Sequence, residues 1–258
     1  MTGALPPSLP EGSTHVHLAE VDGTNAEAMR RVMAGERGPL WITADRQHAG
    51  RGRSGRAWAS STGNLFASHV VAIDALPINA GQLSLVSGVA VADAIGRAGT
   101  VAGLRLKWPN DILIGTAKAG GILIESSMRP GVPGAVAVIG IGLNLTSAPD
   151  DLGRSVTFLA RHGLSLSPAE ALCFLAQTMN EWMTIWDNGA GFEKVRRAWL
   201  ARAGTIGESL TVNALSGPVT GGFAGLDAGG ALLLDIPGQG PQAFSFGDVT
   251  LNLKDENA

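Results

Sequence analysis

The stretch Gly50-Arg51-Gly52-Arg53-Ser54-Gly55-Arg56-Ala57-Trp58 carries the strongest signal in this sequence. Its three glycines let the backbone bend sharply and approach a ligand closely, and its three arginines place permanent positive charges in one short loop. We therefore expect the loop to bind an anion, such as a phosphate or carboxylate group, and to be mobile until that anion neutralises it. Trp58 ends the loop with a flat surface suited to stacking on a purine base. The alternative is an ordinary solvated basic loop.

Predicted strands flank this loop. Residues 40–44 lead into it and residues 65–73 leave it, and a loop of this length between two strands is more often functional than merely connecting. Upstream, residues 14–18 alternate like a strand. Thr24 and Glu27 then form a capping-box pattern that predicts a helix over residues 25–33.

Two lysines lie near predicted turns. Lys107 ends a strand over residues 104–107, directly before the turn Trp108-Pro109-Asn110-Asp111, where its ammonium group would be held over a cleft. Lys118 precedes a strand over residues 122–126, and an isolated lysine there is most simply a solvated turn residue. A further strand over residues 136–145 contains Gly140 and Gly142, a spacing that lets a ligand or a backbone approach closely.

The C-terminal part of the chain changes character. Helices are predicted over residues 81–97, 167–186 and 192–203, the second of them opened by the capping box Ser167-Pro168-Ala169-Glu170. After Gly207, five short β-type runs are separated by glycine or proline turns, and this spacing predicts a small barrel. The runs cover residues 209–212, 219–226, 231–236, 243–246 and 249–253.

Composition restricts the class of protein. The chain has 258 residues, 45% of them hydrophobic and 16% charged, so it is globular rather than disordered. A formal net charge of -3 argues against a broad nucleic-acid-binding face. The single Cys173 excludes an internal disulfide or a multi-cysteine metal site. Residues 1–12 are a proline-containing leader without signal-peptide character, and apolar stretches are too short to span a bilayer, so we expect a cytoplasmic protein with no membrane partner.

Several motifs, taken in order, resemble the signature of biotin protein ligases. The resemblance covers nearly the whole chain and rests on Gly50 to Trp58, Lys107-Trp108-Pro109-Asn110-Asp111, Lys118-Ala119-Gly120-Gly121-Ile122-Leu123, Gly140-Ile141-Gly142-Leu143-Asn144, Asp22-Gly23-Thr24-Asn25, Gly225-Leu226-Asp227, Gly230-Ala231-Leu232-Leu233 and Gly247-Asp248-Val249.

The resemblance implies an α+β fold: a catalytic domain over residues 1–205, similar to class II aminoacyl-tRNA synthetases with a mixed or antiparallel sheet and flanking helices, and an SH3-like barrel over residues 206–258. It implies a reaction in two halves. Biotin and ATP, with Mg²⁺, give biotinyl-5′-adenylate, and biotin then passes to a lysine of a biotin carboxyl carrier domain of acetyl-CoA carboxylase or a related carboxylase. No helix-turn-helix region precedes Thr14, so we expect the monofunctional type, and a homodimer through the catalytic sheet is plausible.

The resemblance also assigns residues that would bind the ureido end of biotin. Gly23, Thr24, Asn25 and Gln47 match residues that line that end, and the loop residues Arg51, Gly52 and Arg53 close over it. Gly23 stands where the family often has serine. Only the backbone then remains to contact the ureido group there, which would weaken biotin binding.

On the adenylate side, Lys107 would hold the carboxylate and α-phosphate oxygens, with Lys118 as a second lysine near the adenylate. Together with Arg53, these lysines are the expected catalytic residues. Trp58 would stack on adenine and Asn144 would contact its polar edge, while Arg51 and Arg53 would also contact the adenylate. Asp111 matches the aspartate of the family motif, for which a metal or acceptor-lysine role is possible.

Two other functions compete with this interpretation. Lipoate protein ligases share the adenylation chemistry and a related fold, but the sequence contains no Arg-Arg-x-Ser-Gly-Gly-Gly motif. A nucleic-acid-binding module would use the basic loop and the barrel. The net charge of -3 and the absence of tyrosine argue against it.

Overall fold

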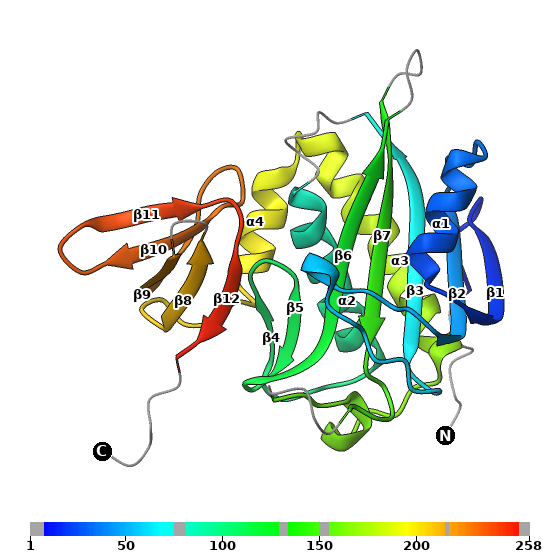
Figure 1. Ribbon diagram of the computed structural model, residues 1–258, viewed down its shortest axis with the longest axis horizontal. Coiled ribbons are helices and arrows are strands. Elements are labelled where there is room, and N and C mark those ends of the chain that lie inside the picture. Colours follow the sequence, from blue (N-terminus) through cyan, green and yellow to red (C-terminus); the bar gives the residue numbers. More distant parts are fainter. Residues whose placement is uncertain (1–7, 75–80, 129–133, 150–154, 215–216, 253–258) are drawn as a thin grey trace.

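Two β-sheets organise the chain (Figure 1). The computed structural model describes residues 8–74, 81–128, 134–149, 155–214 and 217–252. The helices and strands, in chain order, are β1 Thr14–Val21, α1 Thr24–Met33, β2 Leu40–Gln47, the 3-10 helix η1 Arg53–Gly55, β3 Leu65–Ile73, α2 Gln82–Ala98, β4 Leu104–Lys107, β5 Asp111–Ile114, β6 Ala117–Ser127, β7 Ala135–Leu143, η3 Leu159–His162, α3 Pro168–Trp186, η4 Asp187–Gly189, α4 Phe192–Leu200, β8 Ser209–Ala214, β9 Gly217–Leu226, β10 Leu232–Ile236, β11 Gly240–Phe244 and β12 Asp248–Leu251.

The larger sheet has seven strands in the order β1-β2-β3-β7-β6-β5-β4. Only the β1–β2 pair within it is parallel, so the expected mixed sheet with flanking helices is confirmed. β3 and β7 are almost continuously buried because helices cover both faces of the sheet, which explains why their sequences are apolar runs. α1 lies on one face, and α2, α3 and α4 lie on the other (Figure 1).

The two faces bury separate hydrophobic clusters. Ala28 and Val32 of α1 pack on Ile42, Val70 and Val138. The larger cluster lies under α2 and α3 and includes Trp41 and Trp186, whose Nε1 donates to Gln82 Oε1 at 2.8 Å. Burying each large apolar side chain contributes about 1.5–3 kcal/mol to the stability of the fold. This cluster therefore supports the sheet from the face opposite to α1.

The smaller sheet has five antiparallel strands in the order β11-β10-β9-β8-β12. Between the described residues of the edge strands β11 and β12 no ladder forms, so the sheet is open and the closed barrel predicted from the sequence is not confirmed. It sits beside the β4 end of the large sheet (Figure 1). The junction is bonded: Lys107 Nζ donates to Val249 O at 2.7 Å, and Trp108 Nε1 donates to Gly230 O at 3.1 Å.

One local prediction at the start of α1 is wrong. The N-cap of α1 is Gly23, and Glu27 does not cap the helix because its carboxylate accepts hydrogen bonds from Arg30 and Arg31. Thr24 instead turns its hydroxyl toward the sheet. The capping box at Ser167 and Glu170 is confirmed.

Two other expectations concern the leader and the membrane. Residues 1–7 of the expected leader lie outside the described part of the chain. Over the described ranges, no helix combines the length and apolarity needed to cross a bilayer.

Candidate active site

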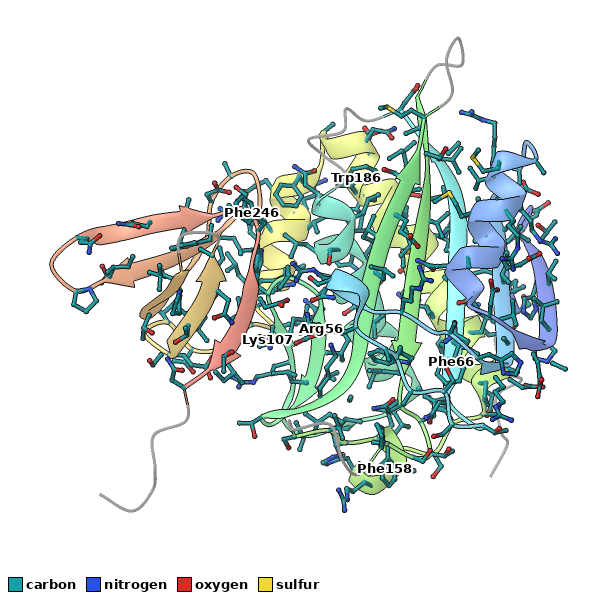
Figure 2. The ribbon with its side chains drawn as sticks, viewed as in Figure 1. Arg56, Phe66, Lys107, Phe158, Trp186 and Phe246 are labelled. Atoms are coloured by element: carbon teal, nitrogen blue, oxygen red, sulfur yellow. The ribbon has the colours of Figure 1, made fainter. Side chains whose placement is uncertain are left out.

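A cavity of about 590 Å³ opens on the face of the large sheet next to α1, within the range expected for a small-molecule site. The start of α1, the end of β2, the loop after it, the turn between β4 and β5, strands β6 and β7, and β12 of the small sheet all line it. Arg56 and Lys107 lie on the side of the cavity that faces the small sheet (Figure 2).

The basic loop forms a short hairpin of its own. Arg51 and Ala57 form an isolated antiparallel bridge, and Gly52 N donates to Arg56 O at 2.7 Å. The tip passes through the left-handed region at Ser54 (φ 55°) and Gly55 (φ 71°), a conformation that serine adopts at a cost. The loop thus holds its backbone by internal hydrogen bonds, and its three arginines line the cavity.

The arginines of the loop reach the small sheet. Arg53 donates to Gly247 O at 3.1 Å and to Asn110 Oδ1 at 3.4 Å, and Arg56 pairs with Asp248 at 2.7 Å. β12 therefore closes one end of the cavity by binding the loop. Arg53 is also 3.8 Å from Asp248, so one carboxylate holds two guanidinium groups that are otherwise suited to bind phosphate.

Two lysines converge on one buried carboxylate. Lys107 Nζ lies 2.8 Å from Asp111 Oδ2, and Lys118 Nζ contacts the other oxygen, Oδ1. Burial raises the pKa of the Asp111 carboxyl, but the ammonium groups of Lys118 and Lys107 outweigh burial and hold that pKa below its ordinary value. Asp111 is therefore ionised at neutral pH and keeps both lysines in place in the cavity.

Trp58 lies flat on a glycine surface of the large sheet. A Cβ atom built at Gly142 would lie 2.5 Å from Trp58 Cε2, and one at Gly121 would lie 3.1 Å from Trp58 Cζ3. Lys118 Nζ is 5.6 Å from the centroid of the indole ring, within the range of a cation–π contact. Trp58 Nε1 is buried against the Gly142 side of the sheet and has no hydrogen-bond partner.

The far end of the cavity is polar, and apart from the carboxylates of Asp22 and Glu125, which accept hydrogen bonds from Arg30 and Asn25, its groups are uncharged. Gln47 Oε1 accepts from Thr24 N at 2.9 Å, and Gln47 Nε2 donates to Ser60 Oγ at 3.2 Å. Asn25 lies across the sheet, its amide resting directly over Gly140, where a Cβ would lie 2.4 Å from Asn25 Oδ1. One cavity thus offers neutral hydrogen-bonding groups at one end and a cationic cluster at the other.

Comparisons with known proteins agree with this geometry. Residues 29–144 match the family described as "Biotin/lipoate A/B protein ligase family". The chain is 42% identical over 228 residues to the "Biotin--[acetyl-CoA-carboxylase] ligase" of Paracoccus denitrificans, an alignment covering 85% of this chain and 93% of that protein. The chain belongs to the biotin protein ligase family. It is also 32% identical to the ligase of the same name from Mycobacterium tuberculosis, covering 90% of this chain and 86% of that protein.

Solved structures of the family show the same architecture. The biotin protein ligase from Aquifex aeolicus, in complex with biotin and ATP, superposes with a TM-score of 0.78 at 25% identity, covering 93% of this chain and 99% of that chain.

Nearly all of the residues predicted for the site of a biotin protein ligase line this one cavity. They are Gly23, Thr24, Asn25, Gln47, Arg51, Gly52, Arg53, Trp58, Lys107, Asp111 and Lys118. Lys118 is a strand residue of β6 with a side chain only 12% exposed, which excludes the alternative of a solvated turn residue.

Asn144 is the exception among the predicted site residues. It is buried, lies outside the cavity lining, and donates from Nδ2 to Thr157 O at 3.0 Å. This bond, with the pairing of Lys118 and Val156, fastens the segment after residue 154 to β6. The adenine contact expected of Asn144 is therefore not supported by its position in this structure.

The metal role considered for Asp111 does not fit its surroundings either. Both of its oxygens accept from ammonium groups. Among the described residues, no three histidine, cysteine or acidic side chains gather into a metal-binding group.

Sequence reasoning missed two polar residues near the far end of the cavity. Ser68, fully buried on β3, contacts both Thr24 and Asn25, and Glu125 on β6 accepts from Asn25 Nδ2 at 2.8 Å. A signal existed for Ser68, because it alternates with Phe66 and Val70 on the same face of a strand in which only Ser68 and His69 are polar. Glu125 gave none, because a carboxylate on the exposed end of a strand is commonplace.

Proposed function

We propose that this chain is a biotin protein ligase that activates biotin with ATP to biotinyl-5′-adenylate and transfers biotin to a lysine of a biotin carboxyl carrier domain. The observation that carries the proposal is the polarity of the cavity. A neutral hydrogen-bonding end suits a ureido ring, and Arg53, Lys107 and Lys118 at the other end suit a carboxylate and phosphates.

In the first half-reaction, a biotin carboxylate oxygen attacks the α-phosphorus of ATP. A carboxylate–phosphorus bond forms as the bond from phosphorus to the bridging oxygen breaks, and pyrophosphate leaves. Two anions must be brought together, so the protein contributes fixed positive charge and orientation. Lys107, Lys118 and Arg53 supply this charge, and Asp111 holds the two lysines together in the cavity.

In the second half-reaction, the acceptor lysine amine attacks the carbonyl carbon of the mixed anhydride. The carbon–nitrogen bond forms as the bond from that carbon to the anhydride oxygen breaks, AMP leaves with this oxygen, and the amine loses its proton to solvent. A neutral amine is needed for the attack, and Asp111 is a carboxylate at the cationic end of the cavity. A role in orienting that amine, once a substrate displaces one of its lysines, agrees with its place in the cavity.

Mg²⁺ accompanies ATP in this proposal. It would neutralise charge on the phosphates, and because Mg²⁺ retains water and substrate oxygens as ligands, it needs no dedicated set of protein carboxylates. Asp111 and Asp248 are both engaged by cationic side chains, so no step above depends on their binding metal.

Partner, domain and assembly assignments belong to the same proposal. The acceptor is the biotin carrier domain of acetyl-CoA carboxylase or a related carboxylase, as the names of the relatives suggest. Residues 1–205 form the catalytic domain and residues 206–258 an SH3-like domain that closes the cavity through β12. A homodimer through the free edge of β1 would extend the large sheet. The reaction takes place in the cytoplasm.

Lipoate ligation is the second candidate, because the family model includes lipoate ligases. The relatives named for biotin ligation favour biotin.

Mass spectrometry of the small molecules retained by the purified protein, after incubation with Mg-ATP and either biotin or lipoate, tests both. Retained biotinyl-adenylate is the expected result. Lipoyl-adenylate would assign the protein to the other branch, and the absence of both would overturn the proposal.

A further inference from the structure

We infer that Ser68 and Glu125 are positioning residues that make Thr24 a pure hydrogen-bond acceptor, so that the neutral end of the cavity selects a ligand carrying an N–H group. The inference rests on the proposed function, which places the biotin ureido group at that end. It adds Ser68, which lies outside the cavity lining, and Glu125, which is part of that lining; both act through Asn25 and Thr24.

The orientation of the Asn25 amide fixes the order of these hydrogen bonds. One end of the amide faces Glu125 Oε2 at 2.8 Å and Leu123 O at 3.4 Å. A carboxylate and a backbone carbonyl can only accept, so that end must be the NH₂ group. The carbonyl oxygen Oδ1 therefore faces Ser68 Oγ, 2.6 Å away.

Proton counting then extends the order to Thr24. An amide oxygen cannot donate, so Ser68 is the donor to Asn25 Oδ1. The same Ser68 hydroxyl faces Thr24 Oγ1 at 2.8 Å, again as the donor. The Thr24 hydroxyl in turn donates to Gln47 Oε1 at 3.3 Å. The Thr24 proton therefore stays within the protein, and only a lone pair of Thr24 faces a ligand.

The surroundings prevent the chain of bonds from reversing. Ser68 is fully buried and lies outside the cavity lining, so water does not supply it with an alternative partner; Thr24 is 4% exposed. Ser68, Gly140 and Leu123 occupy one register row across β3, β7 and β6, directly beneath Asn25. Glu125 ends the chain with a charge that can only accept. A ureido N–H meets the resulting acceptor, whereas a ring without N–H groups, such as a dithiolane, leaves Thr24 unsatisfied.

The test measures ligand binding by Ser68→Ala and Glu125→Ala in the full-length protein, with calorimetric Kd values for biotin and steady-state KM values for ATP. We expect Ser68→Ala to weaken biotin binding about tenfold and Glu125→Ala about threefold, with KM for ATP within twofold of the parent protein. Ser87→Ala is the matched control, because Ser87 is equally buried but donates to Leu83 O within α2. Glu125 is exposed, so its variant tests the inference even if Ser68→Ala fails to fold.

A second readout separates positioning from a general structural effect. The parent protein should bind biotin more tightly than analogues methylated at either ureido nitrogen. For each analogue, the ratio of its Kd to the Kd of biotin measures this discrimination, and Ser68→Ala should reduce the larger of the two ratios at least threefold. Unchanged discrimination, unchanged biotin affinity in both variants, or parallel losses for biotin and ATP would overturn the inference. Failure of the unsubstituted protein to bind biotin would overturn the proposed function itself, and this inference with it.

Discussion

The indole of Trp58 lies directly on the Cα of Gly142, so closely that a single methyl group at residue 142 would lie 2.5 Å from the ring. A glycine is required at this position by contact with the ring rather than by its own backbone conformation. The relationship ties a residue of the basic loop to strand β7, so a substitution at Gly142 can displace Trp58 without changing Trp58 itself.

Gly142→Ala should displace Trp58 and weaken ATP binding. If Trp58 stacks on adenine, we expect KM for ATP to rise about tenfold, because stacking contributes about 1–3 kcal/mol. Gly96→Ala is the control, since a Cβ at Gly96 in α2 meets nothing within 4 Å and should stabilise the helix. Parental ATP affinity in Gly142→Ala, measured by steady-state kinetics, would contradict the assigned role of Trp58.

Asp111→Asn should slow adenylate formation about 10- to 100-fold, where each factor of ten corresponds to about 1.4 kcal/mol of transition-state stabilisation. The amide keeps the shape of the side chain but leaves Lys107 and Lys118 without a shared counter-charge. Pyrophosphate release measures the rate. Asp235→Asn, at an exposed position of β10, should retain the parental rate. Equal rates for the two variants would show that the carboxylate does not organise the lysines.

Arg53→Ala should abolish adenylate formation or accelerate adenylate release, because Arg53 is one of the cationic groups at the phosphate end of the cavity. Retention of adenylate on gel filtration reports both effects. The competing nucleic-acid function predicts a different loss, namely weaker and less salt-dependent binding of an oligonucleotide. A variant unchanged in both properties would mean that the loop serves neither.

Gly23→Ser should strengthen biotin binding about three- to tenfold, because one added hydrogen bond contributes a net of about 0.5–1.5 kcal/mol. The backbone there is extended, with φ −168°, and a Cβ would meet no atom closer than 3.8 Å, so serine fits. Gly23→Ala fills the same space without a hydroxyl and should leave affinity unchanged. Equal affinities for both variants in calorimetry would contradict this prediction.

Acid should destabilise the protein through His69. Burial lowers the pKa of His69 to about 4, so the folded state keeps this imidazole neutral while the unfolded state binds a proton below about 6.5. Stability is therefore full above pH 6.5 and falls as the pH drops from 6.5 toward 4, by about 3 kcal/mol from this group.

The substitution His69→Phe removes the titration and retains a ring that stacks on Trp41. Urea unfolding between pH 7 and 4.5 should give a flatter profile for the variant than for the parent protein. Burial and His17 also lower the pKa of His15, so the difference between the two profiles is the informative quantity. Parallel profiles would contradict the assignment.

The sequence by itself determined most elements of the fold and most of the residues that line the cavity. Apolar runs such as β3, helical periodicity in α2, and glycine or proline punctuation in the C-terminal part are local signals, because they depend on the pleat, the helix repeat and the turn types of neighbouring residues. The ordered motifs identified eleven residues that line the cavity, because the resemblance to a known family assigns each motif a place in the site.

Only the tertiary structure decided which groups pair. Lys107 and Lys118 share Asp111 because β4, β5 and β6 lie in one sheet, and Asn144 is taken by Thr157 because a later segment returns to β6. The local sequence pattern likewise could not predict whether the C-terminal strands close into a barrel. Closure depends on the register and twist that would bring β11 and β12 together, and these strands are not neighbours in the sheet. Ser68 and Glu125 acquire their role in the same way, through hydrogen bonds across strands that no spacing along the chain encodes.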